Sequence, residues 1–153
     1  MAKAPQAATS SNNTITGNSV GIYVSNSTNH AITLNVVSGN SGQGILYVSS
    51  TAGGKAENNV ITNSGYGVVY QSAGGDFGGG PSSSVGGNVI SCNTNADFWT
   101  NQLGPTYAAN NLWDHVPPTF SSTSASGGVD IFASQGSGVV VSTGAGLAPS
   151  PCP

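Results

Sequence analysis

Few side chains of this chain could do acid–base, metal or redox chemistry. There is no arginine, and the candidates are Lys3, Lys55, Glu57, Asp76, Asp97, Asp114, Asp130, His30, His115, Cys92 and Cys152. Glycoside hydrolysis needs two carboxylates about 5–10 Å apart. Nucleophilic catalysis by serine or cysteine needs an activating base beside it, and no GxSxG motif is present. Catalysis is therefore not expected from this chain by itself.

The histidines have no evident catalytic partner in the sequence. Asp114 and His115 are adjacent, and neighbours on a strand point to opposite faces, so we expect no direct cooperation. The expectation is that Asp114 caps a turn, that His115 is solvated, and that His30 decorates a polar surface turn. Neither CxxC nor a histidine pair at ligand spacing occurs, and Asp76 is the only acid in its glycine loop. We therefore expect no metal site and no cofactor.

Charge is scarce throughout the chain, which has two cations, five acids and a formal net charge of −3. Binding of a polyanion requires a row of cations, so nucleic-acid binding is excluded, and an anionic membrane surface is disfavoured. The chain has no run of 18 apolar residues that would predict a membrane span. Strong helix formers are few and β-branched residues many, so the chain should be nearly all β.

A short motif recurs along most of the chain at intervals of 22 to 29 residues. It consists of asparagine, any residue and a large apolar residue, and it begins at Asn13, Asn35, Asn59, Asn88 and Asn111. Repetition at such a period predicts stacked coils. We expect the five asparagines to form an internal ladder, since each amide can bond to the equivalent amide one coil away.

Alignment on these asparagines produces two columns of constant character. The second position after the asparagine is apolar and should face inward, whereas the third is small and polar and should face water. The inward set is Ile15, Val37, Ile61, Ile90 and Trp113, and the outward set begins Thr16, Ser38, Thr62, Ser91. This alternation predicts one strand per coil.

A second apolar run follows each polar turn. Its first column, Ile22, Ile45, Val68 and Phe98, is predicted inward, and its second column, Tyr23, Leu46, Val69 and Trp99, outward. An apolar strip on an outer face indicates that something covers it. The candidates are a stacked sugar, a partner subunit, a preceding segment, or residues 119–153 of this chain. Asp76, in a glycine-rich loop at 74–87, is a further candidate contact for a ligand.

These columns resemble those of right-handed parallel β-helix repeat proteins of the pectate-lyase-like superfamily. The likeness covers residues 12 to about 116. Asp76–Gly80 and Gly86–Ile90 resemble a glycine-rich insertion in bacterial members without assigned function, and Asn110–Asp114 with Pro117–Pro118 resembles the end of such helices. The resemblance implies a right-handed parallel β-helix of about four to five coils. Lyase-type members use a catalytic Arg or Lys with calcium-binding acids, and here the acids share no column in the expected register.

Three regions follow from this reading. Residues 1–11 form a disordered or truncated lead, residues 12–118 the coils, and residues 119–153 capping strands and a tail. Val129–Phe132 and Gly138–Val141 are expected to be two final strands or a capping hairpin, and 51–57 and 72–87 to be loops. Cys92 and Cys152 either form a disulfide in an oxidising compartment or remain a buried thiol and a free tail thiol.

The function expected is that of a non-catalytic structural or recognition module of an extracellular or cell-surface protein, part of a longer secreted chain. Its partners would be a neutral polysaccharide or a protein, and end-to-end or lateral self-association is a further option. One rival is a fragment of a polysaccharide lyase or hydrolase whose catalytic coils lie upstream. A weaker one is an ice-binding solenoid using the column Thr16, Ser38, Thr62, Ser91.

Overall fold

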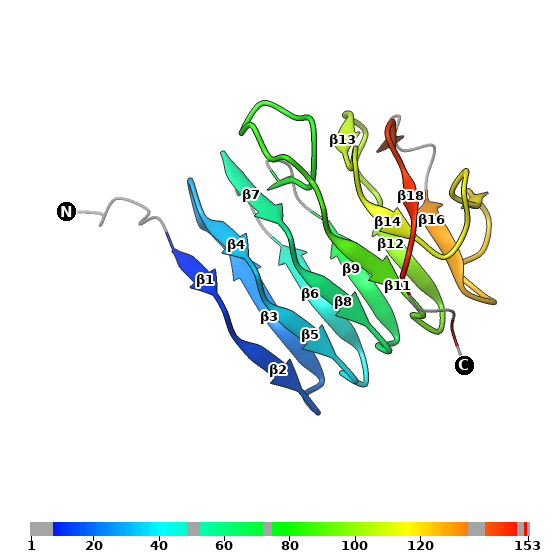
Figure 1. The fold of residues 1–153 in the computed structure, drawn as a ribbon, viewed down its shortest axis with the longest axis horizontal. Helices are drawn as coiled ribbons and strands as arrows, with labels where there is room; N and C mark the ends of the chain where they lie inside the picture. The colour runs from blue at the N-terminus through cyan, green and yellow to red at the C-terminus, as the bar shows by residue number, and fades with distance from the viewer. Residues whose placement is uncertain (1–7, 49–52, 72–74, 135–139, 150–151, 153) are drawn as a thin grey trace.

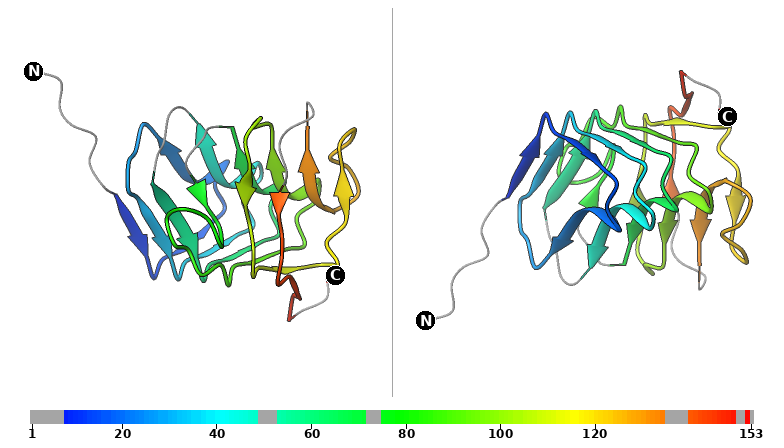
Figure 2. Two further views of the ribbon diagram at one scale, coloured as in Figure 1. Left: turned by 90° about the horizontal axis from the view of Figure 1, so that it is seen from above. Right: turned by 90° about the horizontal axis from the view of Figure 1, so that it is seen from below.

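The computed structural model describes residues 8–48, 53–71, 75–134, 140–149 and 152. Strands stack in these regions into three parallel sheets, and up to residue 100 each turn of the chain contributes one strand to each sheet (Figure 1, Figure 2). This arrangement confirms the predicted parallel β-helix. The described residues contain no helix that is long and apolar enough to cross a membrane.

Each sheet has six strands. Sheet A consists of β1 (Thr9–Ser11), β4 (Ala31–Thr33), β7 (Gly54–Glu57), β10 (Gly75–Asp76), β13 (Thr106–Tyr107) and β17 (Val140–Val141). Sheet B consists of β2 (Thr14–Thr16), β5 (Val36–Ser38), β8 (Val60–Thr62), β11 (Val89–Ser91), β14 (Leu112–Trp113) and β18 (Gly146–Leu147). Sheet C consists of β3 (Val20–Ser25), β6 (Gln43–Val48), β9 (Tyr66–Tyr70), β12 (Ala96–Thr100), β16 (Val129–Ala133) and β15 (Phe120–Ser121).

The strands pair in the register of the repeat. Ile15 pairs with Val37, Val37 with Ile61, and Ile61 with Ile90 in sheet B. The last three of these side chains have no exposed surface. The core continues in a group of aromatic rings whose neighbouring centroids lie 5.1 to 6.4 Å apart, formed by Tyr47, Tyr70, Phe77, Phe98 and Trp113.

An asparagine ladder runs along the corner between sheets A and B. Each amide nitrogen donates to the Oδ1 atom of the next asparagine at 2.9 to 3.1 Å, through Asn13, Asn35, Asn59, Asn88 and Asn111. The residue before each ladder asparagine has a positive φ of 55–70°, and these residues are Asn12, Leu34, Asn58, Gly87 and Asn110. The preceding residue thus adopts the left-handed conformation, while the side chain of the ladder asparagine makes the hydrogen bonds at the corner.

A second ladder, which the repeat analysis missed, lies at the corner between sheets B and C. Backbone amides donate to the side chain one coil on, from Asn18 to Asn40, Asn40 to Ser64, and Ser64 to Asn93, at 3.0 to 3.3 Å. Each of these residues lies five positions after a first-ladder asparagine. The next such position holds Val116, so the second ladder ends at Asn93.

The C-terminal region extends the coils instead of forming a hairpin. β16 pairs in parallel with β12, and β15, which precedes it in sequence, lies outside it at the sheet edge. β17 and β18 then add to sheets A and B. Of the two alternatives expected here, the two strands are observed as β16 and β17, and the capping hairpin is wrong; Gly138 and Val139 lie outside the described residues.

Three expected boundaries also differ from the structure. β1 falls within the expected lead 1–11, and β7 and β10 fall in segments expected to be loops. The sequences of these strands show little alternation of apolar and polar residues. The strands form because their backbones hydrogen-bond to neighbouring coils, and this pairing cannot be recognised from the pattern of side chains. Residues 1–7, 49–52 and 72–74 lie outside the described part of the chain.

Candidate functional site

The outer face of sheet C holds the predicted strip, but its members differ greatly in exposure. Tyr23, Leu46, Val69 and Trp99 pair in successive strands, and Phe132 extends the column. Tyr23 is 63% exposed, Leu46 and Trp99 are partly buried, and Val69 is 1% exposed. Val69 is thus not available to a ligand, which corrects its assignment as a contact residue.

Three aromatic rings form a continuous platform around the Trp99 end of this strip. The ring centroid of Trp99 lies 5.4 Å from that of Tyr66 and 6.1 Å from that of Phe132, with which it is stacked. Trp99 Nε1 donates to Ser134 Oγ at 3.0 Å, which fixes the indole orientation. All three rings are partly buried and none belongs to the central core cluster. We call Tyr66, Trp99 and Phe132 the aromatic platform.

Asp76 organises its glycine loop and is not open to a ligand. Its side chain is 1% exposed. Oδ1 accepts from the backbone amides of Gly78 and Gly80, and Oδ2 from those of Ser82 and Ser84, at 2.9 to 3.1 Å. The neighbouring Phe77 is fully buried in the core. The expected ligand contact through Asp76 is therefore wrong, because four backbone amides saturate the carboxylate.

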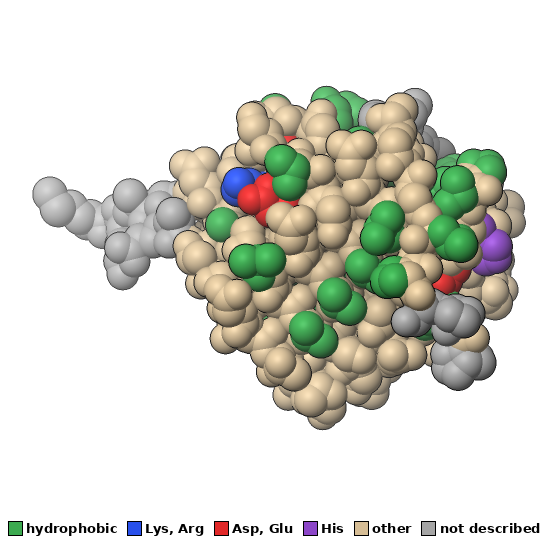
Figure 3. Space-filling model, viewed as in Figure 1, with side chains coloured by type: hydrophobic (Ala, Val, Ile, Leu, Met, Phe, Trp, Pro, Cys, Tyr) green, Lys and Arg blue, Asp and Glu red, His purple; other side chains and the backbone are tan. Residues whose placement is uncertain are grey.

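The outer face of sheet B is nearly uncharged and carries a row of apolar side chains across the coils (Figure 3). Val36 and Val60, which pair in neighbouring strands of this face, are 42% and 37% exposed. The hydroxyl column Thr16, Ser38, Thr62, Ser91 becomes progressively buried, and Ser91 is only 3% exposed. Matched columns of exposed threonines, as an ice-binding face requires, are not formed by the described residues.

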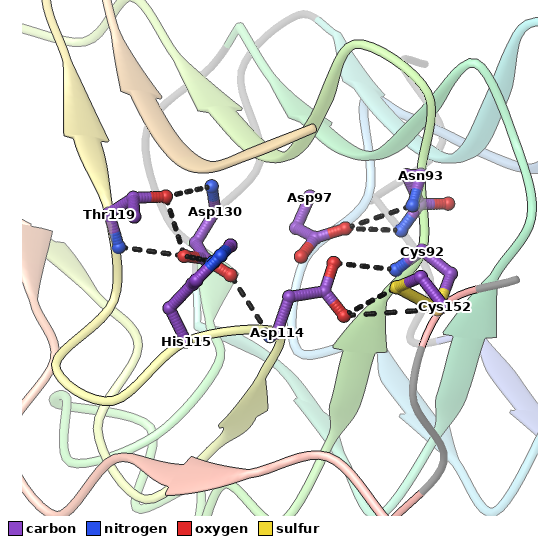
Figure 4. A network of polar contacts seen from close by, with 8 residues as sticks. All are labelled: Cys92, Asn93, Asp97, Asp114, His115, Thr119, Asp130 and Cys152. Atoms are coloured by element: carbon purple, nitrogen blue, oxygen red, sulfur yellow. Dashed lines mark hydrogen bonds and ion pairs between the residues drawn. A yellow bond between two sulfur atoms is a disulfide. The ribbon is translucent and has the colours of Figure 1, made fainter. Parts of the chain in front are cut away.

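Three carboxylates meet where the second ladder ends (Figure 4). One oxygen from each of Asp97, Asp114 and Asp130 lies within 4.8 Å of the others. Asp97 and Asp130 occupy equivalent positions in β12 and β16, between the pairs Ala96–Val129 and Phe98–Ile131. The expectation that these acids share no column is therefore wrong, because the sequence did not reveal that β16 inserts beside β12.

Each acid also has a structural contact. Asp97 Oδ1 accepts from the backbone and side-chain nitrogens of Asn93 at 3.2 and 2.8 Å, in the place that the next ladder amide would take. Asp114 Oδ2 accepts from the backbone amide of Cys92 at 2.9 Å. Asp130 Oδ1 accepts from the backbone amide of Asp114 at 2.9 Å, and its Oδ2 accepts from the backbone and hydroxyl of Thr119.

Asp97 is the least satisfied member of this cluster. It has no exposed surface, and its Oδ2 has no hydrogen-bond partner among the residues that the structure describes. Burial raises the pKa of Asp97 to about 9, and the nearby Asp114 and Asp130 push that pKa in the same direction, against the lowering effect of the Asn93 hydrogen bonds. In the absence of a cation, this carboxyl group is neutral at pH 7.

The two histidines differ from their expected surroundings. His30 is 3% exposed, with its ring 5.3 Å from that of Tyr47 and its Nε2 3.1 Å from the tyrosine hydroxyl. The expected surface position of His30 is therefore wrong, and burial lowers its pKa. His115 is exposed as expected, but its Nδ1 lies 2.8 Å from Asp130 Oδ2. It pairs with an acid from another coil and not with the adjacent Asp114.

A disulfide joins Cys92 to Cys152 across 60 residues and borders the acid cluster (Figure 4). The Cys152 sulfur lies 2.9 Å from Asp114 Oδ1 and has no hydrogen to donate, so this is a contact and not a hydrogen bond. A cavity of about 840 Å³ adjoins the disulfide, and Asp114 and His115 are among the residues that line it.

The cluster does not have the accessibility of a glycosidase pair. Asp97 and Asp130 have no exposed surface, and only Asp114 of the three lines the cavity. A glycosidase needs both carboxylates to reach the scissile bond from the substrate site. The cluster can hold a proton or a cation, whereas the aromatic platform can contact a ligand in solvent.

Comparison with known proteins places the chain in a family. Residues 3–120 match the model of a family described as a protein of unknown function (DUF1565). This match covers more than half of the chain, so the chain belongs to that family. No match was found among the curated proteins or among the solved structures.

Proposed function

We propose that this member of the DUF1565 family is a rigid recognition module that binds neutral glycans through the outer face of sheet C. The observation that carries the proposal is the aromatic platform, in which Tyr66, Trp99 and Phe132 lie 5.4 to 6.1 Å apart as neighbours. Aromatic rings contact sugar faces with large apolar area and lose little conformational entropy.

The platform is fixed before a ligand arrives. Trp99 is held by the hydrogen bond to Ser134 and by the flanking rings, and the strands beneath are paired on both sides. A fixed side chain loses less freedom on binding, so more of the contact energy becomes affinity. The exposed Tyr23 lies further along the same outer column and extends the surface toward the first coil.

The ligand is proposed to be uncharged because the protein has almost no charge with which to select an ionic one. Lys3 and Lys55 are the only cations in the sequence. Lys55 lies in sheet A, 2.7 Å from Glu57, and is thus already paired. Hydroxyl-rich chains match a surface on which most side chains are polar and uncharged.

An extracellular or cell-surface location is part of the same proposal. The disulfide between Cys92 and Cys152 supports it, because disulfides persist in oxidising compartments. The coils and the asparagine ladder also support kinship with the pectate-lyase-like superfamily. We propose a non-catalytic role, supported by the burial of Asp97 and Asp130.

Affinity electrophoresis through gels that contain xylan, β-glucan or galactomannan tests the proposal. The native protein should be retarded by at least one of these glycans. Trp99→Ala should weaken retention about tenfold or more, because truncation of a central aromatic anchor costs more than ~1.4 kcal/mol. Tyr23→Ala should have a smaller effect, because its ring lies outside the platform.

Phe120→Ala is the matched control. Phe120 is 62% exposed but belongs to the edge strand β15 and not to the platform, so its loss should leave retention unchanged. Equal retention of the native protein and Trp99→Ala would contradict the assigned surface. Absence of retention by every neutral glycan, with release of reducing or unsaturated ends from polysaccharides, would favour an enzyme instead.

A further inference from the structure

We propose that Asp97, Asp114 and Asp130 bind one calcium ion at the end of the second asparagine ladder. The three residues come from β12, the segment after β14, and β16, so the site joins the last coils of sheets B and C (Figure 4). The proposal concerns a different part of the molecule from the aromatic platform and does not depend on it.

The first observation is an oxygen atom without a partner. Asp97 has no exposed surface, yet its Oδ2 accepts no hydrogen bond within the described part of the chain. One Asp97 oxygen lies within 4.8 Å of one oxygen each from Asp114 and Asp130, and in Figure 4 Oδ2 is the oxygen that points toward these two acids and away from Asn93. A buried carboxylate oxygen without a partner is costly, and a cation at this point would satisfy it.

The other two acids keep coordination capacity as well. Asp114 Oδ1 faces the disulfide, and its Oδ2, on the side of Asp97 in Figure 4, accepts only the backbone amide of Cys92 among the described residues. Asp130 Oδ1 likewise accepts only the backbone amide of Asp114 among those residues. A carboxylate oxygen has two lone pairs, so each of these oxygens can bind a metal and keep its hydrogen bond.

The coil architecture does not itself require acids at these positions. The positions equivalent to Asp97 in the three preceding strands of sheet C are Gly21, Gly44 and Gly67. A Cβ at Gly67 would lie 2.7 Å from Asn93 Nδ2 and 3.0 Å from Ile90 Cγ2, so that corner admits no side chain. Aspartates replace glycine in two neighbouring strands only where the ladder has ended.

The type of ligand favours calcium over magnesium. Calcium accepts several carboxylate and carbonyl oxygens in a flexible geometry, whereas magnesium demands a near-ideal octahedron and usually keeps several waters. One oxygen from each of the three acids lies within 4.8 Å of the others, which is close enough for all three to share one ion. Asp114 also lines the cavity of about 840 Å³, through which the ion could enter and water complete its coordination.

Isothermal titration of the chelator-treated full chain with CaCl2 tests the site, together with a thermal melt. We expect saturable binding of one ion and a higher Tm in calcium, since a ligand of the folded state stabilises it. Asp97→Asn should weaken calcium binding about tenfold or more, while its amide oxygen can still accept from Asn93. Glu57→Gln removes an acid from sheet A and should leave binding unchanged.

Several outcomes would overturn the proposal. One is the absence of both binding heat and a Tm shift at CaCl2 concentrations up to about 10 mM, which is above the dissociation constants of weak extracellular calcium modules. Another is calcium binding by Asp97→Asn that is as tight as that of the native protein. Magnesium bound as tightly as calcium would refute the assignment to calcium. Should Asp97→Asn fail to fold, Asp114→Asn takes its place, because Asp114 is partly exposed and its loss leaves the buried pair in position.

Discussion

At the scale of single residues, burial determines the roles of the ionisable groups. Asp76 is saturated by four backbone amides, whereas Asp97 Oδ2 accepts no hydrogen bond from the described residues. His30 is enclosed with Tyr47 against Gly54, where a Cβ would come within 1.7 Å of the imidazole ring. A glycine at position 54 is thus needed to admit the histidine.

Burial of His30 predicts a pH dependence of stability. Its pKa is lowered in the folded state, so the unfolded chain binds a proton more readily as pH falls below the ordinary value of 6.5. The contribution of neutral His30 is fully present above that value and is lost progressively below it, down to the folded-state pKa. The group facing it is Tyr47, whose pKa burial raises, so the tyrosine stays neutral.

The measurement is denaturant unfolding of the native chain and of His30→Gln between about pH 7.5 and 5. Glutamine retains a polar group near Tyr47 but does not titrate. The native protein should lose more unfolding free energy over this interval than the variant, by at most ~1.4 kcal/mol per pH unit. Parallel pH profiles would show that His30 does not titrate on unfolding.

At the scale of elements, the corner before sheet B imposes a left-handed residue in every coil. Four of the five residues there are asparagine or glycine, and Leu34 is the exception, with φ 58° and a side chain that is 55% exposed. An L-residue in this conformation costs about 1–2 kcal/mol, and asparagine tolerates it better than leucine. The backbone at Leu34 is therefore strained, and its largely exposed side chain offers little burial to offset that strain.

Leu34→Asn should raise the unfolding free energy by roughly 0.5–1 kcal/mol. Chemical denaturation of the variant measures this gain. Leu103→Asn is the control, since Leu103 is 83% exposed and does not have a positive φ. A gain of equal size in both variants would point to removal of exposed apolar surface and would contradict relief of backbone strain.

The sequence was sufficient to predict the regular coils because their signal is repeated. The column Val37, Ile61, Ile90 and the first ladder follow from alternation and spacing alone. The short strands β7 and β10 carried no such signal. The second ladder could have been found from the constant offset of five residues between Asn13 and Asn18 and between Asn35 and Asn40.

The acid cluster could not be predicted because it depends on chain order at the end of the stack. A simple continuation would place β15 directly beside β12, but β16 occupies that place and brings Asp130 to Asp97. The burial of His30 was missed for a related reason. The space beside Gly54 is created by a neighbouring coil, and no local pattern records it.

At the scale of the whole molecule, the disulfide fastens the C-terminal tail to the coil stack. It links Cys152 to Cys92, 60 residues earlier, in the fourth coil. The double variant Cys92→Ser, Cys152→Ser should lose up to about 4 kcal/mol of unfolding free energy, the value expected for a loop of this length. Melting curves with and without reductant measure the loss.

Reductant should lower the Tm of the native protein and leave the double variant unchanged. The same Tm for oxidised, reduced and serine forms would mean that the tail contributes nothing to the stability of the coils. Cys92 also donates its backbone amide to Asp114, and this contact does not require the sulfur. The serine forms therefore remove the covalent link without removing that hydrogen bond.

Recognition through the aromatic platform is the central claim, and fluorescence of Trp99 tests it most directly. The chain has two tryptophans, and Trp113 is fully buried, so Trp113→Phe leaves Trp99 as the single reporter. Titration with soluble xylan, β-glucan and galactomannan should give, for at least one glycan, a saturable change in Trp99 emission and protection from acrylamide quenching. Emission and quenching that stay the same with every glycan, in a variant that melts cooperatively, would contradict the account.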